Sequence, residues 1–189
     1  MIQKFSFNKT EIDGLILIKP FVAYDERGYF IKDYNKKLFL ENGIEHELKE
    51  VFYAHSRKGV IRGIHFQRER QQAKLVRCIS GNIYDVIVDL RKGSSTFGKW
   101  QGFELSEANK DVLYVPSGCG HGYIVLENAI VSYKCAEDFY GEYDDGIIWN
   151  DKDLNINWGT DRVSELTLSD KDKALQTFEE FKSRYGGLN

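Results

Sequence analysis

The chain has 189 residues, with 26 basic and 29 acidic side chains and a formal net charge of -3. This length can bury one sizeable core, so we expect a single domain over residues 1–189. The interspersed charge offers no basic field for nucleic acid, and no apolar run reaches the ~20 residues of a membrane helix. The N-terminal residues MIQKFSFNKTEID lack the apolar core of a secretory signal, and the three cysteines show no CxxC spacing. We therefore expect a cytoplasmic protein without a disulfide framework.

Alternation of apolar and polar residues predicts ten short β-strands, rich in β-branched and aromatic side chains. In chain order they cover residues 14–19, 29–33, 48–54, 60–67, 73–79, 82–90, 100–105, 112–115, 122–126 and 129–135. Turn signals separate the strands, most clearly at Ser80-Gly81 and Glu127-Asn128. Many short strands joined by turns indicate a mainly β fold, either a barrel or a sandwich.

Helix signals are few. Residues 35–41 predict a short helix that Asn42-Gly43 stops. Residues 171–185 predict the one long amphipathic helix, and Ser169 with Asp172 resembles a capping pattern at its start. Residues 143–167 show no periodicity, so we expect a loop that packs two tryptophans.

Charged side chains fall on the inward face of three successive predicted strands. Because alternate strand residues share a face, His65, Lys74 and Asp85 stand among apolar neighbours. A lone histidine in a strand is more often structural, but buried charges are costly unless they are paired or functional. Arg62 falls on the opposite face from His65. A site that contains both requires a bulge in the strand, which we place at Gly63.

The stretch PSGCGHG at residues 116–122 is a turn between two strands. Its spacing, PxGxxH before an apolar strand, is the second signature motif of the cupin barrel, and GxHFQ at 63–67 resembles a degraded first motif. Metal-binding cupins place two histidines one residue apart in the first motif, which bind an ion together with the histidine that matches His121. Gln67 stands where the second histidine should be, so we expect no catalytic metal.

Phrases across nearly the whole chain resemble the dTDP-4-dehydrorhamnose 3,5-epimerase family, metal-free cupins that act on nucleotide-linked 4-keto sugars. In the family's order, they are DERGYF at 25–30, RGIHFQ at 62–67, AKLVR at 73–77, DVIVDLR at 85–91, STFG at 95–98, PSGCGHG at 116–122, SYK at 132–134, WND at 149–151 and LSDKD at 168–172. The resemblance implies a cupin barrel (a double-stranded β-helix, or jelly roll) with a few short helices and a C-terminal helix. It also implies a homodimer with exchanged N-terminal strands and no cofactor.

Inverting a carbon beside a ketone requires a base, an acid on the opposite face, and stabilisation of the enolate oxygen. The resemblance implies that His65 is the base, held at Nδ1 by Asp172, that Tyr133 is the acid and that Lys74 stabilises the enolate. From the residues alone, Asp172 could equally start a helix and Tyr133 could fill the interior. These alternatives stay open.

The resemblance further implies a diphosphate-binding set of Arg27, Arg62 and His121, in which arginine forks grip phosphate oxygens. Other substrate-binding positions that it implies are Phe30, Lys32, Glu50, Phe52, Gln67, Asp85 and Tyr140. Lys32 stands where the family has an acidic residue, and Phe52 stands where it has an amide, so the site that reads the base is altered.

The resulting hypothesis is a cofactor-independent isomerase that epimerises a nucleotide-diphospho-4-keto-6-deoxy sugar at C3, C5 or both. The pathway would be deoxysugar biosynthesis for a surface polysaccharide, with dTDP, GDP, CDP or UDP as the carrier. The alternatives are a C3-only or C5-only epimerase, a 3,4-ketoisomerase, and a non-catalytic cupin that binds a sugar or nucleotide.

Overall fold

The computed structural model describes residues 4–189, and most of its regular structure is β-strand. The strands are β1 (Ser6–Lys9), β2 (Ile16–Lys19), β3 (Phe21–Asp25), β4 (Gly28–Lys32), β5 (Glu50–Ser56), β6 (Ile61–Gln67), β7 (Lys74–Asp89), β8 (Trp100–Ser106), β9 (Val112–Val115), β10 (Cys119–Cys135) and β11 (Asp144–Gly146). The helices are α1 (Lys36–Glu41), the 3-10 helix η1 (Thr160–Arg162), α2 (Asp170–Lys173) and α3 (Phe178–Tyr185).

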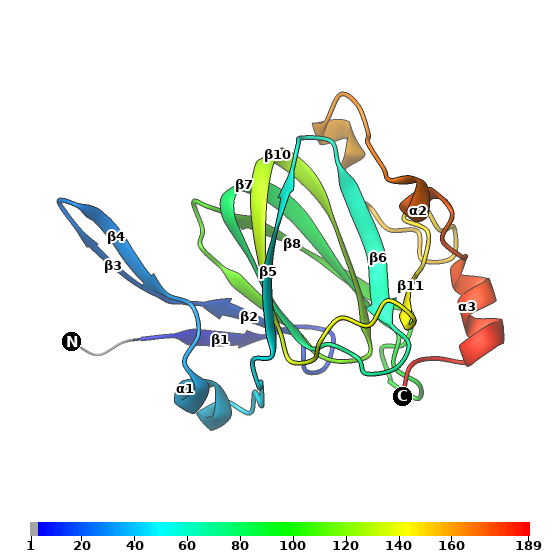
Figure 1. Cartoon of the computed structure of the whole chain (residues 1–189), viewed down its shortest axis with the longest axis horizontal. Coiled ribbons are helices and arrows are strands. Elements are labelled where there is room, and N and C mark those ends of the chain that lie inside the picture. The colour runs from blue at the N-terminus through cyan, green and yellow to red at the C-terminus, as the bar shows by residue number, and fades with distance from the viewer. Residues whose placement is uncertain (1–3) are drawn as a thin grey trace.

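The long strands β7 and β10 form the spine of the molecule. They pair antiparallel from Cys119 opposite Asp89 to Cys135 opposite Lys74. At the end of the pair that contains Lys74 and Cys135, β7 also pairs with β9 and β10 with β5. At the end that contains Asp89 and Cys119, β7 pairs with β8 and β10 with β6. The strands therefore wrap around a common interior (Figure 1). The predicted mainly β architecture is confirmed.

The prediction that strands end at Ser80-Gly81 and Glu127-Asn128 is wrong. β7 and β10 continue through both positions, and the register between them is irregular from Val125 to Val131. Gly81 has a φ of +79°, and a Cβ there would lie 2.1 Å from the backbone oxygen of Asn128. Glycine is therefore needed at a bend where two strands approach closely, and its sequence signal imitates a turn.

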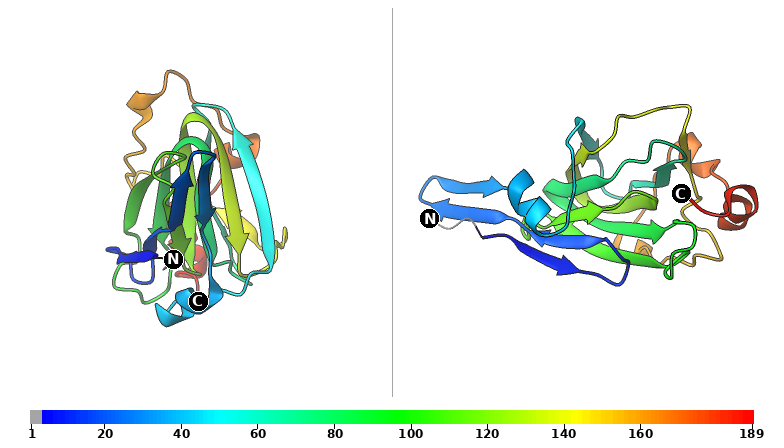
Figure 2. Two further views of the ribbon diagram at one scale, coloured as in Figure 1. Left: turned by 90° about the vertical axis from the view of Figure 1, so that its left-hand side faces the viewer. Right: turned by 90° about the horizontal axis from the view of Figure 1, so that it is seen from below.

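The sequence does not predict β1, β3 or β11. β3 and β4 form a separate two-stranded sheet that projects from the barrel as a hairpin (Figures 1 and 2). The hairpin exposes 68% of Tyr24 and 58% of Phe30. Such large exposed aromatic side chains are typical of a surface that another molecule covers.

The predicted helix over residues 171–185 is wrong, because two short helices occupy this range. Between them, Gln176 forms a β-bridge with Ile147 and accepts a backbone hydrogen bond from Ile148. Thr177 then starts α3 with a capping box. Pairing with a distant segment thus outweighs the helical pattern. The short helix predicted near residue 35 is confirmed as α1, with Asn35 as its N-cap.

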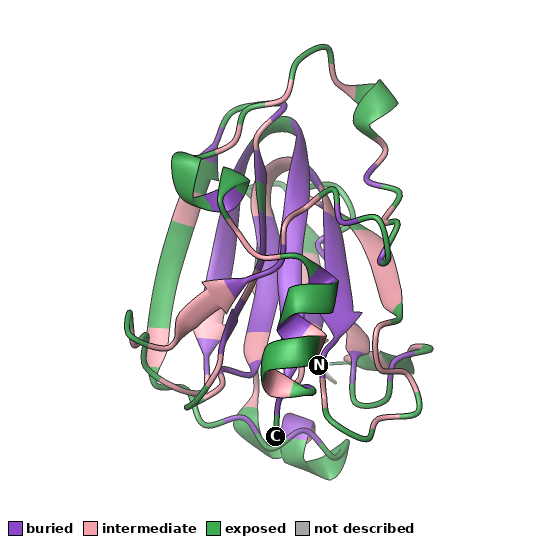
Figure 3. Cartoon of the chain, turned by 90° about the vertical axis from the view of Figure 1, so that its right-hand side faces the viewer, coloured by how far each residue is buried: buried purple, intermediate pink, exposed green. Residues whose placement is uncertain are grey.

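Two apolar clusters lie on the two faces of the barrel strands, and a third among the described residues packs Phe39 of α1 against Ile18 and Val112. The first fills the interior with strand residues such as Val76, Ile87 and Val125. The second lies between the other face of the strands and the C-terminal segment, where Trp158 and Phe181 are buried. Figure 3 shows α3 covering this buried face. Within residues 4–189, no helix is both long and apolar enough to cross a bilayer.

Candidate active site

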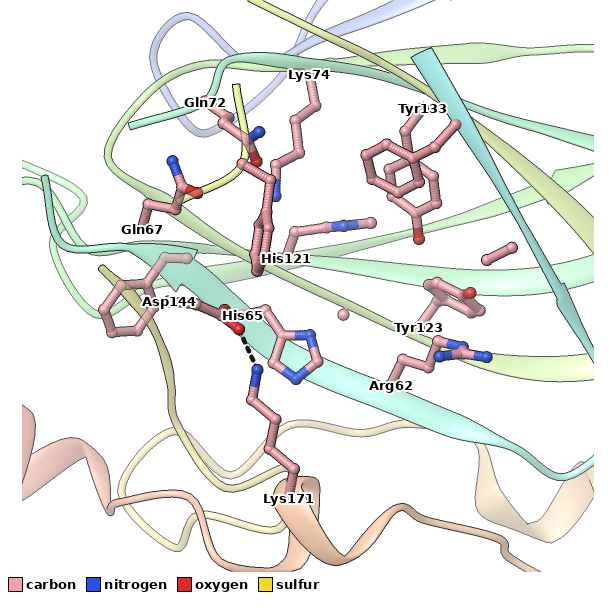
Figure 4. A pocket seen from close by; sticks show the side chains of 15 residues that line it. Arg62, His65, Gln67, Gln72, Lys74, His121, Tyr123, Tyr133, Asp144 and Lys171 are labelled. Carbon is pink, nitrogen blue, oxygen red and sulfur yellow. Dashed lines mark hydrogen bonds and ion pairs between the residues drawn. The ribbon is translucent and has the colours of Figure 1, made fainter. Parts of the chain in front are cut away.

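A pocket of about 200 Å³ opens into the barrel interior between β5, β6, β7 and β10. Ligand-sized pockets usually measure roughly 300–1,000 Å³, so this one suits a single sugar ring better than a whole nucleotide sugar. It brings together seven residues predicted for the site, most of them labelled in Figure 4: Phe52, Arg62, His65, Gln67, Lys74, His121 and Tyr133.

The predicted bulge in β6 is confirmed. His121 pairs with His65 and Tyr123 pairs with Arg62, so β6 has one residue more than β10 over this interval. Gly63, with a φ of +112°, lies at the bulge, where a Cβ would come within 2.5 Å of the Gly122 Cα. The extra residue turns both Arg62 and His65 towards the pocket.

His65 forms a close pair with Asp172 of α2. The distance from His65 Nε2 to Asp172 Oδ1 is 2.5 Å, and Ser169 Oγ donates to the other carboxylate oxygen at 2.7 Å. Burial alone would raise the pKa of Asp172, but hydrogen bonds from His65 and Ser169 outweigh it and hold this pKa below its usual value. The prediction that Asp172 holds Nδ1 is wrong, because the contact uses Nε2 and leaves Nδ1 as the second ring nitrogen.

A second imidazole–carboxylate pair lies deeper in the barrel. His121 Nε2 is 2.8 Å from Asp85 Oδ2, and both side chains are buried. The His121 ring meets the Tyr133 ring edge-on at 5.8 Å. The structure therefore places His121 at the inner end of the pocket. It is not grouped with Arg27, its predicted partner in diphosphate binding, because Arg27 does not line this pocket.

Lys74 and Tyr133 supply a cation and a phenol to the same pocket. The half-buried Lys74 ammonium forms no hydrogen bond or ion pair with the residues that the structure describes. Burial lowers the pKa of this ammonium. Burial raises the pKa of Tyr133 well above the usual value of 10.0, and Tyr123 adds to this effect. Phe52 stacks on the Tyr133 ring at 4.6 Å. Tyr133 is consequently a neutral phenol in a fixed position at neutral pH.

Several predicted residues lie outside the pocket. Arg27, Phe30 and Lys32 are on the projecting β3–β4 hairpin. Asp85 reaches the pocket only through His121, and Glu50 sits at the start of β5 without lining the cavity.

Tyr140 is also not among the residues that line the pocket. Its hydroxyl accepts a hydrogen bond from Arg70 at 3.2 Å, and its ring lies against the same guanidinium. Its neighbour Phe139 lines the pocket in its place.

The structure adds pocket residues that the sequence did not single out. Lys171 of α2 forms an ion pair with Asp144 at the rim (Figure 4). Lys171 lies inside the phrase LSDKD next to Asp172, so its position could have been noticed. Asp144 comes from the stretch without periodicity at 143–167 and Phe139 from the residues just before it, and no local signal marks either residue.

The two histidines of the cupin motifs do not share a ligand position. Each binds its own carboxylate, and the side-chain amide of Gln67 is bonded to backbone groups. In the described part of the chain, no three or more His, Cys, Asp or Glu side chains are grouped in a way that could hold a metal ion. The absence of a catalytic metal stays a prediction.

The arrangement suits proton transfer at carbon. Figure 4 shows His65, Lys74 and Tyr133 on different walls of the same pocket. A hydrogen-bonded imidazole can take a proton, a phenol can return one, and an ammonium stabilises negative charge on an oxygen between them.

Comparisons with known proteins agree with this chemistry. Residues 9–180 match the family model described as dTDP-4-dehydrorhamnose 3,5-epimerase. A protein of that name from Methanothermobacter thermautotrophicus is 46% identical, over 94% of this chain and 96% of the relative.

Solved structures give the same result. A dTDP-6-deoxy-D-glucose-3,5-epimerase from Legionella pneumophila, in complex with dTDP-4-keto-L-rhamnose, matches with a TM-score of 0.89 and 36% identity, covering 93% of this chain and 94% of that one. A 3'-monoepimerase from Streptomyces bikiniensis, in complex with dTDP-quinovose, matches with a TM-score of 0.84 and 29% identity over 95% and 90% of the two chains. The likeness confirms the predicted cupin barrel, and the chain belongs to the dTDP-4-dehydrorhamnose 3,5-epimerase family of isomerases.

Proposed function

We propose that this protein epimerises a nucleotide-diphospho-4-keto-6-deoxy sugar at C3, C5 or both, in deoxysugar biosynthesis for a surface polysaccharide. The observation that carries the proposal is the pocket that His65, held by Asp172, shares with Tyr133 and the Lys74 ammonium. A protein that only binds a sugar has no need for a base, an acid and an orienting carboxylate together.

The reaction follows from these positions. With Nε2–H donating to Asp172, His65 Nδ1 removes the proton beside the C4 ketone, and the C–H electrons form an enolate whose negative oxygen faces Lys74. The Tyr133 hydroxyl gives a proton to the opposite face of the same carbon, which inverts it. The Tyr133 phenolate then takes a proton from water readily, because the pKa of Tyr133 is raised well above 10.0, and His65 gives the proton that it removed to water, which restores both residues.

Solvent exchange tests the proposal. The protein is incubated in D2O with the 4-keto-6-deoxy sugar on each of the four carriers, and deuterium at C3 and C5 is followed by NMR. We expect incorporation at one or both carbons with at least one carrier, and loss of incorporation in His65→Ala. No deuterium at either carbon with any carrier would exclude the proposed reaction.

The number of inverted carbons and the carrier are finer parts of the proposal. A dTDP carrier is favoured by the names of the relatives, two of which were solved with dTDP-sugars. The Streptomyces bikiniensis 3'-monoepimerase is a specific reason to keep a C3-only epimerase as the second candidate. Product NMR distinguishes the two, because a C3-only enzyme leaves the configuration at C5 unchanged.

We also propose that the working form is a homodimer in which the β3–β4 hairpin of each chain completes the site of the other. The hairpin carries the predicted substrate residues Arg27, Phe30 and Lys32, yet it projects away from its own pocket (Figure 1). The outer face of β5 exposes 63% of Tyr53, so a second apolar area is available for pairing.

Subunit mixing tests the shared site. Arg27→Ala and His65→Ala proteins are each impaired, but a heterodimer of the two has one site with an intact pocket and an intact hairpin. Random re-association of equal amounts should therefore restore about a quarter of wild-type activity. No recovery, together with confirmed heterodimers by mass spectrometry, would show that each site draws on one chain.

We further propose that the enzyme works in a reducing, cytoplasmic setting as a single domain. All three cysteines are free and buried, and this supports the proposal because none is engaged in a disulfide.

A further inference from the structure

The amide of Gln67 is fully occupied by backbone contacts. Its Nε2 donates to the Arg70 carbonyl oxygen at 2.7 Å and to the Asp138 carbonyl oxygen at 3.3 Å. Its Oε1 accepts from the Tyr140 backbone N–H at 2.6 Å. The side chain is almost completely buried. One amide hydrogen and the oxygen thus hold residues 138–140, the other hydrogen holds Arg70 in the turn after β6, and neither hydrogen is left to donate to a ligand.

The rest of the turn between β6 and β7 contacts the same loop. Gln72 Nε2 donates to the Glu137 carbonyl oxygen at 2.9 Å, and Arg68 Nη2 donates to the Glu142 carbonyl oxygen at 2.5 Å. Arg70 contacts Tyr140 through both its hydroxyl and its ring. Three glutamine or arginine side chains of this turn therefore bind backbone carbonyls of a loop about 70 residues away, which fixes the path of the loop.

The loop fixed in this way carries Phe139 into the pocket wall. Phe139 lines the cavity with 55% of its surface exposed, so less than half of its surface is packed against the protein. The flanking residues Asp138 and Tyr140 are the two that Gln67 binds through their backbones. Gln67 therefore holds the backbone on both sides of the Phe139 ring, whereas Gln72 and Arg68 bind the loop farther from it.

We propose that Gln67 is a positioning residue, which sets the place of Phe139 against the substrate sugar and does not bind the substrate itself. This rests on the proposed epimerase function, since it assigns the apolar part of the sugar site. Metal-binding cupins have a histidine ligand at this position. In this chain Gln67 stands there and fixes a wall of the pocket.

A double-mutant cycle tests the proposal. In Gln67→Met, which keeps the length of the side chain but removes its hydrogen bonds, KM should rise by about fivefold to tenfold while kcat changes by less than about twofold. Phe139→Ala should give a similar KM. The double variant should match Phe139→Ala alone, because Gln67 acts through that ring. Gln71→Met is the matched control: Gln71 makes one long bond of 3.4 Å within its own turn, and its loss should leave KM unchanged.

A second measurement does not depend on turnover. Hydrogen exchange of the Tyr140 amide should be faster in Gln67→Met than in wild type and unchanged in Phe139→Ala. Gln67→Leu, which also removes the acceptor for the Tyr140 amide, provides the same comparison if Gln67→Met does not fold. Additive KM effects in the cycle, or equal amide protection in wild type and the Gln67 variant, would overturn the proposal. Absence of deuterium exchange in the wild-type protein would instead overturn the proposed function, so the two failures are distinguishable.

Discussion

Asp172→Asn is the most direct perturbation of the proposed base. Asparagine keeps the size of the side chain and can still contact His65, but it removes the negative charge that faces the imidazolium formed after proton transfer. The two groups are joined at 2.5 Å, and Asp172 is only 4% exposed. The substitution therefore changes the charge beside the base and little else.

The magnitude follows from the geometry. Two unit charges about 4 Å apart interact by about 4 kcal/mol at an effective dielectric constant of about 20. The His65 side chain is 31% exposed, and water will screen part of this interaction. We take about 2–3 kcal/mol, which corresponds to a rate reduction of about 30- to 150-fold.

The assay is the initial rate of deuterium incorporation from D2O, measured by NMR on folded protein. Asp170→Asn is the matched control, because Asp170 belongs to the same short helix but is exposed and does not contact His65. It should change the rate by less than about twofold. If Asp172→Asn kept more than half of the wild-type rate while folded, the role of Asp172 in supporting the imidazolium would be refuted.

Four further results are expected. Tyr133→Phe should still exchange deuterium at a carbon from which His65 removes a proton, but that carbon should keep its configuration, as measured by NMR of the product. Lys74→Met should abolish exchange yet raise the unfolding free energy at pH 7 by about 1 kcal/mol, measured with denaturant, because a half-buried ammonium without a partner is removed. Because burial lowers the pKa of Lys74, wild-type exchange should decline with rising pH before ordinary lysines titrate, whereas Lys74→Arg should retain its residual rate there. Asp89 has a pKa lowered to about 2, since bonds from Arg91, Ser94 and Thr96 outweigh its burial. Asp89→Asn should therefore cost about 2–3 kcal/mol at pH 7, and this difference should shrink as the pH falls from about 4 towards 2 in denaturant titrations.

The sequence alone determined which strand faces look inward. Strand alternation depends only on local geometry, so it placed His65 and Lys74 in one interior before any tertiary contact was known. By the same alternation, Arg62 reaches that face only if the strand has a bulge. Glycine at position 63 marked where the backbone could form the bulge. Resemblance to a known family then supplied the reaction type.

Only the tertiary structure decided the features that depend on distant partners. It divided residues 171–185 into two helices because Gln176 pairs with Ile147, and it carried β7 through the glycine at position 81 because Asn128 lies against it. It placed Phe139 at the pocket in preference to Tyr140, because Gln67 binds the loop from about 70 residues away. These outcomes depend on contacts between segments far apart in the chain, which local periodicity does not encode.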